Sequence, residues 1–478
     1  MEVLQRTANR GSVSTGPYQI GNSVKLEDTN TEYLQRAASG SDGDRRTMTL
    51  SMWLKRTAIG NDHIFYSQGS HVRFRWKTSN YFSLRLANGH EFENESRLFR
   101  DPSAWYHMVV AIDTTQSTDT NRVKIYWNGV QETTFDTAQY PDQNEELTLG
   151  QFSSVTTQLG WFVEGGYGFD GYISEVNYID GLQKAPTDFG EFDSDTGIWI
   201  PKEYTGSYGS EGFFLNFDSS GSMGADSSGN SNNFNLNNVA AADQATDTPT
   251  NNFAIGNILT GTGGYFVITE GATKAVLSTA GPGNNIGGVS LMSTLAPSSG
   301  KWYFEAQNTN SGDVYLFLGV ADTASIGYTD GYVLGGQNGT TPSIAWRGGG
   351  AYDGSAKVYS NNSATGSSVN WETEVVGVAL DLDNNKIYFH KSGTWINSGD
   401  PANGTDNGGQ YDLPTAEDGQ WLLGVSGYNL ATWLLNFGGY TTMSISSAAS
   451  DANGYGTFEY APPTGYYALC TKNLAEYG

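Results

Sequence analysis

Four oxygen-bearing side chains lie in a stretch that is rich in glycine and serine. They are Asp218, Asp226, Asn230 and Asn232. Carboxylate and amide oxygens are the ligands that hard cations such as calcium prefer. Asp and Asn also cap turns by hydrogen-bonding nearby backbone groups, and turn formation is therefore the alternative interpretation. The stretch predicts either a structural calcium site, the one cofactor that the sequence suggests, or a loop braced by its own side chains.

Aromatic residues near glycine-rich turns offer a second kind of chemistry. An exposed ring stacks on a sugar or buries against a partner protein, whereas a buried ring packs a core. We predict carbohydrate or partner binding, with core packing as the alternative for each residue, at Trp161, Tyr167, Trp346, Tyr352 and Trp395.

The elements that must position the first of these residues are organised around Ala104–Gly129. Trp105–Asp113 carries apolar groups on both parities, which is typical of a central strand covered on both faces. Val123–Trp127 then alternates apolar and polar residues, which indicates a second strand. Asn128-Gly129 is a strong hairpin signal because both positions tolerate positive φ. We expect an antiparallel sandwich around these two strands.

The second half of the chain has the same character. Lys301–Ala306 and Val314–Ala321 are predicted strands, and Glu374–Leu382 is apolar on both faces. Lys386–His390 is expected to pair back through the turn at Asp383–Asn385. No segment has a sustained helical period. The sequence therefore predicts an all-β protein made of two antiparallel β-sandwich (jelly-roll) domains in series.

The boundaries follow from shifts in composition. Residues 1–15 are polar, without a clear period, and are predicted to be an arm, with a disordered tail as the alternative. Residues 16–242 form the first sandwich. Residues 243–257 are polar, contain a Thr-Pro step, and are predicted to be a linker. Residues 258–478 form the second sandwich.

Composition limits the classes of function. The net charge of −25 disfavours nucleic acid and anionic membranes, because a polyphosphate partner needs Lys and Arg to displace its counterions. No run is long and apolar enough for membrane insertion, and the N-terminus lacks the apolar core of a signal peptide. The single cysteine, Cys470, allows no intrachain disulfide and fits folding in a reducing cytoplasm.

Two sets of motifs carry resemblances to known domains. In the first half, WYH-x-V-x-x-x-D, R-V-x-I-Y-x-N-G and Phe169–Asp180 resemble the laminin-G/pentraxin-like jelly roll of the concanavalin A-like class. In the second half, Gly300–Ala306, Leu318–Asp322, Glu374–Trp395 and Leu435–Gly438 resemble the SPRY domain, another two-sheet sandwich. Laminin-G-like domains often hold calcium at a loop end, which favours the calcium interpretation of the Asp218 set.

A narrower resemblance is to virion proteins of tailed phages, many of them marine. It rests on five spaced motifs in one order: Arg6–Gly16, Ser51–Arg56, Arg100–Tyr106, Gly197–Gly209 and Asp226–Asn233. The resemblance implies a capsid-exposed fibre or decoration protein, with a tail fibre or receptor-binding protein as the alternative. Its outer domains would bind host-surface glycans or other cell-surface polymers.

The same resemblance sets the expected partners and location. We expect the arm to dock on the major capsid protein or another virion protein through Arg6 and Arg10, because arginine stays charged and offers five donors. A homo-oligomer is expected, with a trimer as one arrangement. The chain would be made in the host bacterial cytoplasm without a signal peptide and would lie on the virion surface.

Catalysis is the disfavoured alternative. A glycan depolymerase needs two carboxyl groups across the scissile bond. Glu191, Asp193 and Asp195 partly resemble the E-x-D-x-x-E strand of concanavalin-type glucanases, but Thr196 replaces the final Glu. No pair of histidines has metal-ligand spacing, and no nucleophile elbow or phosphate-binding loop is present. We therefore predict a binding protein that is not an enzyme.

Overall fold

The chain forms two compact units, which divide between Asn251 and Asn252. We call them the N-terminal sandwich and the C-terminal sandwich. The computed structural model describes residues 18–260, 266–277, 289–311, 315–325, 334–335, 342–348, 356–365, 369–405, 408–428 and 431–478. Arg6 and Arg10, predicted to dock on a virion, lie outside these residues.

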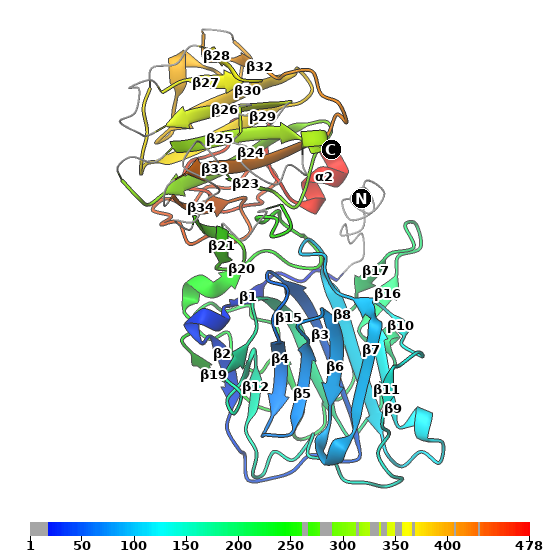
Figure 1. Cartoon of the computed structure of the whole chain (residues 1–478). Helices are drawn as coiled ribbons and strands as arrows, with labels where there is room; N and C mark the ends of the chain where they lie inside the picture. The colour runs from blue at the N-terminus through cyan, green and yellow to red at the C-terminus, as the bar shows by residue number, and fades with distance from the viewer. Residues whose placement is uncertain are drawn as a thin grey trace. The chain divides into compact units, whose positions relative to one another are not determined.

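The N-terminal sandwich is built from two large antiparallel sheets whose inner faces share one apolar core (Figure 1). The first sheet has the order β10 (Val130–Gln131), β9 (Val123–Trp127), β8 (Tyr106–Asp113), β3 (Thr47–Arg56), β15 (Gly171–Asp180), β1 (Ser23–Leu26) and β20 (Gln244–Ala245), and β18 (Phe213–Leu215) also pairs with β15. The second sheet has the order β11 (Thr137–Ala138), β7 (Glu91–Leu98), β6 (Tyr81–Arg85), β5 (Val72–Trp76), β4 (His63–Gln68), β12 (Thr157–Leu159), β2 (Tyr33–Arg36) and β19 (Asn235–Asn237).

Short elements complete this unit. Two small hairpins pair β13 (Trp161–Phe162) with β14 (Tyr167–Gly168) and β16 (Gly190–Phe192) with β17 (Trp199–Pro201). Its single-turn 3-10 helices are η1 (Asp28–Asn30), η2 (Ala87–Gly89), η3 (Asp119–Asn121), η4 (Pro186–Asp188) and η5 (Ala241–Asp243).

The strands predicted at the centre of this unit are confirmed. Met108, Val110 and Ile112 of β8 enter the main core, while Val109 on the opposite face packs in a separate apolar cluster with Phe189. β8 therefore has both faces covered, as its apolar pattern indicates. Asn128 and Gly129 both have positive φ, of 48° and 78°, and form the turn between β9 and β10.

The C-terminal sandwich also has two main sheets. The first has the order β21 (Phe266–Thr269), β22 (Lys274–Leu277), β34 (Thr432–Asn436), β24 (Lys301–Asn308), β29 (Val375–Asp381), β30 (Lys386–Lys391) and β31 (Thr394–Trp395), with β32 (Tyr411–Asp412) on β30 and β35 (Tyr467–Ala468) parallel to β24. The second has the order β23 (Val289–Met292), β33 (Trp421–Tyr428), β25 (Tyr315–Asp322), β26 (Ser343–Gly348), β27 (Val358–Ser360) and β28 (Ser363–Thr365).

This unit also contains the 3-10 turns η7 (Thr323–Ser325) and η8 (Ile396–Ser398), and the short helix α2 (Thr471–Tyr477). Across the described residues, no helix combines the length and the apolar character needed to cross a membrane. The all-β prediction with two antiparallel sandwiches is confirmed.

The predicted linker, residues 243–257, is packed rather than exposed. Its first part belongs to the N-terminal sandwich, because β20 pairs with β1 and Asp247 forms a buried ion pair of 2.6 Å with Lys55 of β3. Asp247 also accepts a hydrogen bond from the indole N–H of Trp105. From Asn252 onward the segment belongs to the C-terminal sandwich, where the backbone of Phe253 forms an antiparallel β-bridge with that of Cys470. Polar side chains of this segment, such as that of Asp247, therefore form buried contacts within a sandwich.

A β-bulge in β15 places an acidic side chain in the interior. Glu175 lies at the bulge with φ of +51° and is 8% exposed. The hydroxyl of Tyr18 donates a hydrogen bond of 2.7 Å to its carboxylate. Burial and, to a smaller extent, the carboxylates of Asp218 and Glu203 raise the pKa of Glu175 to about 7, although the hydrogen bond from Tyr18 opposes the shift.

This shift predicts that the N-terminal sandwich loses stability as pH rises. The folded pKa lies above the ordinary value of 4.5, so folding retains a proton that the unfolded chain releases between these two values. The contribution is complete below pH 4.5 and is lost as pH approaches 7. Glu175→Gln has no charge to bury, so its stability relative to wild type should rise across this window by up to about 3 kcal/mol.

Hydrogen exchange of the β3 and β15 amides at several pH values measures this effect within one sandwich. Glu95→Gln, a change at an exposed carboxylate, is the matched control and should follow wild type. Parallel pH profiles for wild type and Glu175→Gln would contradict the prediction.

Candidate functional site

The β13–β14 hairpin packs against β4 and carries two of the aromatic residues predicted for binding. The hydroxyl of Ser67 in β4 donates a hydrogen bond of 2.7 Å to the carbonyl of Trp161, which fixes the hairpin to the outer side of the second sheet. Phe162 and Tyr167 are directly opposite each other in the hairpin. The hairpin therefore adds aromatic rings to the outer face of the second sheet.

The aromatic rings of the hairpin have different environments. Trp161 is half-buried and stacks on Tyr33 of β2, with ring centroids 5.9 Å apart. Phe162 is buried, and the guanidinium of Arg73 lies 4.9 Å from the centre of its ring. Tyr167 is 46% exposed. The two predicted residues therefore differ. The ring of Tyr167 is available to a ligand, whereas Tyr33 covers part of the Trp161 ring.

Gly165 shows that the rings of Phe162 and Tyr167 lie beside each other. A methyl group added at Gly165 would come within 2.8 Å of the Phe162 ring and 2.6 Å of the Tyr167 ring. The close approach requires a residue without Cβ at this position. Tyr167 is consequently held next to the ring that supports Arg73.

Strand register extends this face into a row of hydrogen-bonding side chains. Neighbouring residues on β2, β4, β5 and β6 enter the core, so the members of the row point to the outer face. Figure 1 shows β4, β5, β6 and β7 side by side. In register order the row contains Asn235, Gln35, Gln158, Ser67, Arg73, Arg85 and Glu91.

The middle of this row is already organised by side-chain contacts. The Gln158 amide donates a hydrogen bond of 3.2 Å to the Gln35 oxygen. The Ser67 hydroxyl lies 3.3 Å from the Gln158 oxygen. Amides, hydroxyls and charged groups are the partners that a polyhydroxylated ligand requires, and an aromatic ring binds its apolar face. We call Tyr167, Trp161 and this row the hairpin face.

Only the two hairpin residues of the predicted aromatic set belong to the hairpin face, and sequence reasoning missed the row. The alternation in Val72–Trp76 places arginines between core residues and was a usable signal. Tyr33, Gln35 and Gln158 gave none, because their alignment depends on pairing between distant strands.

Of the three aromatic residues predicted for binding in the C-terminal sandwich, the structure describes Trp346 and Trp395. Trp346 is fully buried and packs against Trp371, so its prediction as a binding residue is wrong, because no face of its ring is accessible. Trp395 is half-buried, and its ring lies 5.0 Å from His390. Tyr352 lies outside the described residues.

His390, which lies beside Trp395, belongs to a buried hydrogen-bond network. The backbone N–H of Gly393 donates to Nδ1 of His390, so Nε2 carries the proton and donates to the Tyr303 hydroxyl at 2.7 Å. Tyr303 in turn donates to Glu305 at 2.8 Å. Burial lowers the pKa of His390 to about 3, which keeps the imidazole neutral. This connected network rigidifies the sheet beneath Trp395.

The residues predicted to bind calcium brace loops in the N-terminal sandwich. The Asp226 carboxylate accepts hydrogen bonds from the backbone N–H groups of Phe214, Ser228 and Asn232. The side-chain amides of Asn230 and Asn232 both donate to the Gly212 carbonyl. Asp218 accepts hydrogen bonds from Asn22 and Asn216 instead.

The rest of the described chain offers no stronger centre. Among these residues no group of three or more His, Cys, Asp or Glu side chains is arranged to hold a metal. The calcium site at the Asp218 set stays a prediction.

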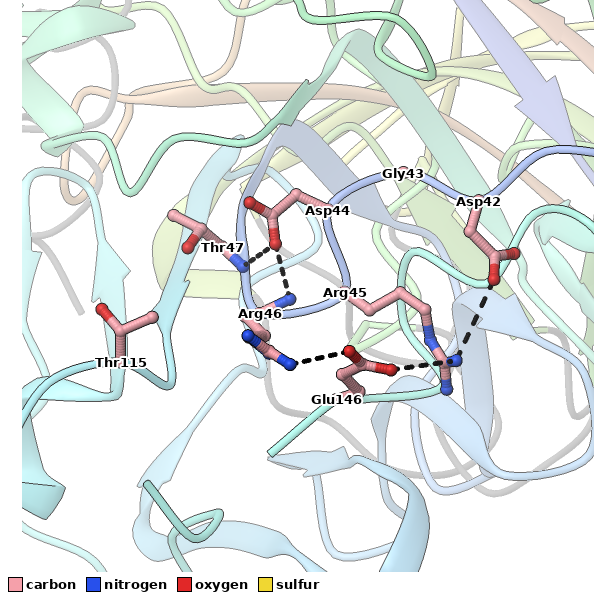
Figure 2. Close-up of a pocket in the computed structure, with 8 residues that line it drawn as sticks. All are labelled: Asp42, Gly43, Asp44, Arg45, Arg46, Thr47, Thr115 and Glu146. Carbon is pink, nitrogen blue, oxygen red and sulfur yellow. Dashed lines mark hydrogen bonds and ion pairs between the residues drawn. The ribbon is translucent and has the colours of Figure 1, made fainter. Parts of the chain in front are cut away.

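A polar pocket lies elsewhere on the N-terminal sandwich, with a volume of about 460 Å³ (Figure 2). Its lining is Asp42, Gly43, Asp44, Arg45, Arg46, Thr47, Thr115 and Glu146. Arg46 pairs with Glu146 at 2.8 Å, and Arg45 lies 3.7 Å from the same carboxylate. Asp44 accepts the backbone N–H groups of Arg46 and Thr47. These charges satisfy one another, and no aromatic ring lines the pocket, so the hairpin face is the better candidate.

Substitution of Asp226 distinguishes a calcium site from a loop braced by its own side chains. If the carboxylate is a brace, Asp226→Ala should lower the free energy of unfolding of the N-terminal sandwich by about 1–3 kcal/mol without calcium, because it leaves backbone donors unpaired. The loss should be the same with calcium present. Denaturant unfolding with EDTA or with added calcium measures it, and Asp195→Ala, at an exposed position, is the control. A loss confined to the calcium-containing samples would support the metal site instead.

Comparisons with known proteins agree with the sheet architecture. Residues 28–183 match the Laminin_G_3 family model, described as the concanavalin A-like lectin/glucanases superfamily. This region contains the hairpin and much of the second sheet, but less than half of the chain. No protein of curated function matches the sequence.

The chain also has partial similarity to solved structures. The TRIM65 PSpry domain is 14% identical, with a TM-score of 0.26, over 38% of this chain and 91% of that chain. The SPRY domain of human HERC1 is 13% identical, with a TM-score of 0.25, over 37% and 94%. A Bacteroides ovatus protein provisionally described as carbohydrate-binding is 14% identical, with a TM-score of 0.31, over 46% and 59%.

Proposed function

We propose that this chain is a carbohydrate-binding adhesion protein and that it binds glycans through the hairpin face. The observation that carries the proposal is the exposed ring of Tyr167, held beside an outer row of amide, hydroxyl and charged side chains. A sugar presents an apolar face to a ring and hydroxyl groups to polar partners. The match of residues 28–183 to the concanavalin A-like lectin/glucanases superfamily supports this class of ligand.

Binding without catalysis fits the contacts of acidic residues on the hairpin face and in the glucanase-like motif. Glu91 lies 3.9 Å from Arg75, and Glu93 forms an ion pair of 3.2 Å with Lys77. Asp193, considered above as part of a glucanase-like motif, accepts the backbone N–H groups of Asp195 and Thr196 within a turn. These carboxylates have structural partners, which favours a lectin-like role over a depolymerase.

The setting that we propose is the surface of a tailed-phage virion. The five motifs that resemble phage virion proteins support this proposal. In this setting the chain is a capsid-exposed fibre or decoration protein, and a tail fibre is the alternative. The N-terminal arm contacts the major capsid protein or another virion protein, copies of the chain form a homo-oligomer, and host-surface glycans are the ligand.

Tyr167 tests the glycan-binding proposal. Tyr167→Ala removes the exposed ring and should weaken binding to the best ligand of a glycan array by about tenfold, which corresponds to about 1.4 kcal/mol. Affinity is then measured by titration calorimetry with that ligand. Phe192→Ala removes another exposed aromatic ring of the same sandwich and should leave affinity unchanged. Equal losses in both variants, or none in either, would contradict the assignment of the site.

The virion setting is tested on particles. Antibodies against the chain should label purified phage at the capsid, and deletion of residues 2–11 should leave a folded protein that is missing from particles. The reason is that the arm carries Arg6 and Arg10 outside the sandwich pattern. Incorporation of the truncated protein at the normal copy number would exclude the arm as the anchor, and labelling of the tail would favour the alternative.

A further inference from the structure

Two arginines of the hairpin face occupy directly opposed positions on neighbouring strands. Arg73 of β5 pairs in register with Arg85 of β6. Their sequence neighbours Phe74 and Leu84 are fully buried in the core, so both arginines belong to the outer face. Like charges directly opposite each other destabilise a sheet. The pair therefore costs the unliganded protein stability.

Arg75 and Lys77 on the same face form ion pairs, but this pair does not, because Glu91, which is opposite Arg85 in register, contacts Arg75 instead. Arg75 forms an ion pair of 3.0 Å with Asp62, and Lys77 pairs with Glu93. Within the described parts of the chain, neither Arg73 nor Arg85 has a carboxylate oxygen within 4.0 Å. The Nε atom of Arg73 is buried without a hydrogen-bond partner in the same set of residues. The two guanidinium groups thus retain unused donors.

The surroundings of Arg73 hold it in place for a ligand. Its guanidinium lies over the Phe162 ring, and Phe162 lies beside the exposed ring of Tyr167. Burial and the charges of Arg75 and Arg85 lower the pKa of Arg73, while the charges of Glu91 and Asp62 oppose the shift. An anion placed between Arg73 and Arg85 would relieve this repulsion. A ligand that carries both an anionic group and a sugar ring matches the arrangement.

We infer that the hairpin face takes an anionic saccharide, with a carboxylate or sulfate group held between Arg73 and Arg85 and an adjacent sugar ring on Tyr167. This inference rests on the proposed glycan-binding function. Guanidinium groups bind carboxylate and sulfate oxygens through paired N–H donors, which an ammonium group cannot reproduce. The net charge of −25 repels anions at long range, so recognition depends on this local contact.

The test uses the full chain and short oligosaccharides of equal length. Titration calorimetry compares hexamers of galacturonic acid, of sulfated galactose and of neutral glucose. At least one anionic hexamer should bind more tightly than the neutral one, and the double variant Arg73→Gln with Arg85→Gln should weaken that binding by at least about tenfold. Replacement of both residues by Lys should give an intermediate affinity, because charge remains but the paired donors are lost. The preferred hexamer identifies the anionic group.

Two controls separate recognition from general effects. Arg46→Gln removes one exposed arginine that pairs with Glu146, and it should leave the affinity unchanged. The double Gln variant should melt at or above the wild-type temperature, because it removes opposed like charges; lost binding then reflects the site and not unfolding.

Several results would overturn the inference. If the double Gln variant binds anionic hexamers as wild type does, while Tyr167→Ala weakens binding, the site is a glycan site without anion recognition. If wild type binds the neutral hexamer as tightly as the anionic ones, the site likewise does not recognise the anionic group. Hexathymidylate, an anionic hexamer of another class, serves as a further probe. If it binds as tightly as the anionic hexasaccharides, the attraction depends on charge alone. If no oligosaccharide binds, the proposed function and this inference fail together.

Discussion

Strand alternation is the constraint on which the candidate site depends. In β5, Val72, Phe74 and Trp76 fill the core, and the period of two forces the residues between them to the outer face. The same rule acts in β6, where Phe82 and Leu84 are buried. A shift by one residue would place arginines in the core, so burial of the apolar set fixes the register and thereby the outer row. The site is consequently as rigid as the core behind it.

This rule explains which parts of the structure could be predicted from the sequence. The strands β8 and β9, the turn at Asn128-Gly129 and the paired strands β29 and β30 are local patterns, and each is present. The outer row is different, because Gln35, Ser67, Gln158 and Asn235 come from strands far apart in the sequence. Their alignment follows from the pairing order of the sheet, which single-strand periodicity does not contain.

The differences between the structure and the sequence predictions have a related cause. Glycine-rich surroundings suggested that Trp346 lies near a turn, yet it belongs to β26 inside the sandwich, where it packs on Trp371. Polar composition suggested a linker around Asp247, whose partner Lys55 lies in the central strand β3. A buried charge is stable only when it is paired, and the pairing here spans distant parts of the chain. Composition alone could not distinguish this ion pair from a solvated segment.

Electrostatic pairing also accounts for the distinct character of the hairpin face. The chain contains twice as many acidic residues as basic ones, 50 against 25, yet several described cations, among them Arg100, Lys124 and Lys202, have no carboxylate oxygen within 4.0 Å. Lys25 contacts both Glu32 and Asp243, and Arg36 is bound by Glu211. Arg73 and Arg85 differ from these residues because they are directly opposed on neighbouring strands. A surface that receives an anionic ligand requires donors that the protein itself leaves unused, and two opposed guanidinium groups supply them.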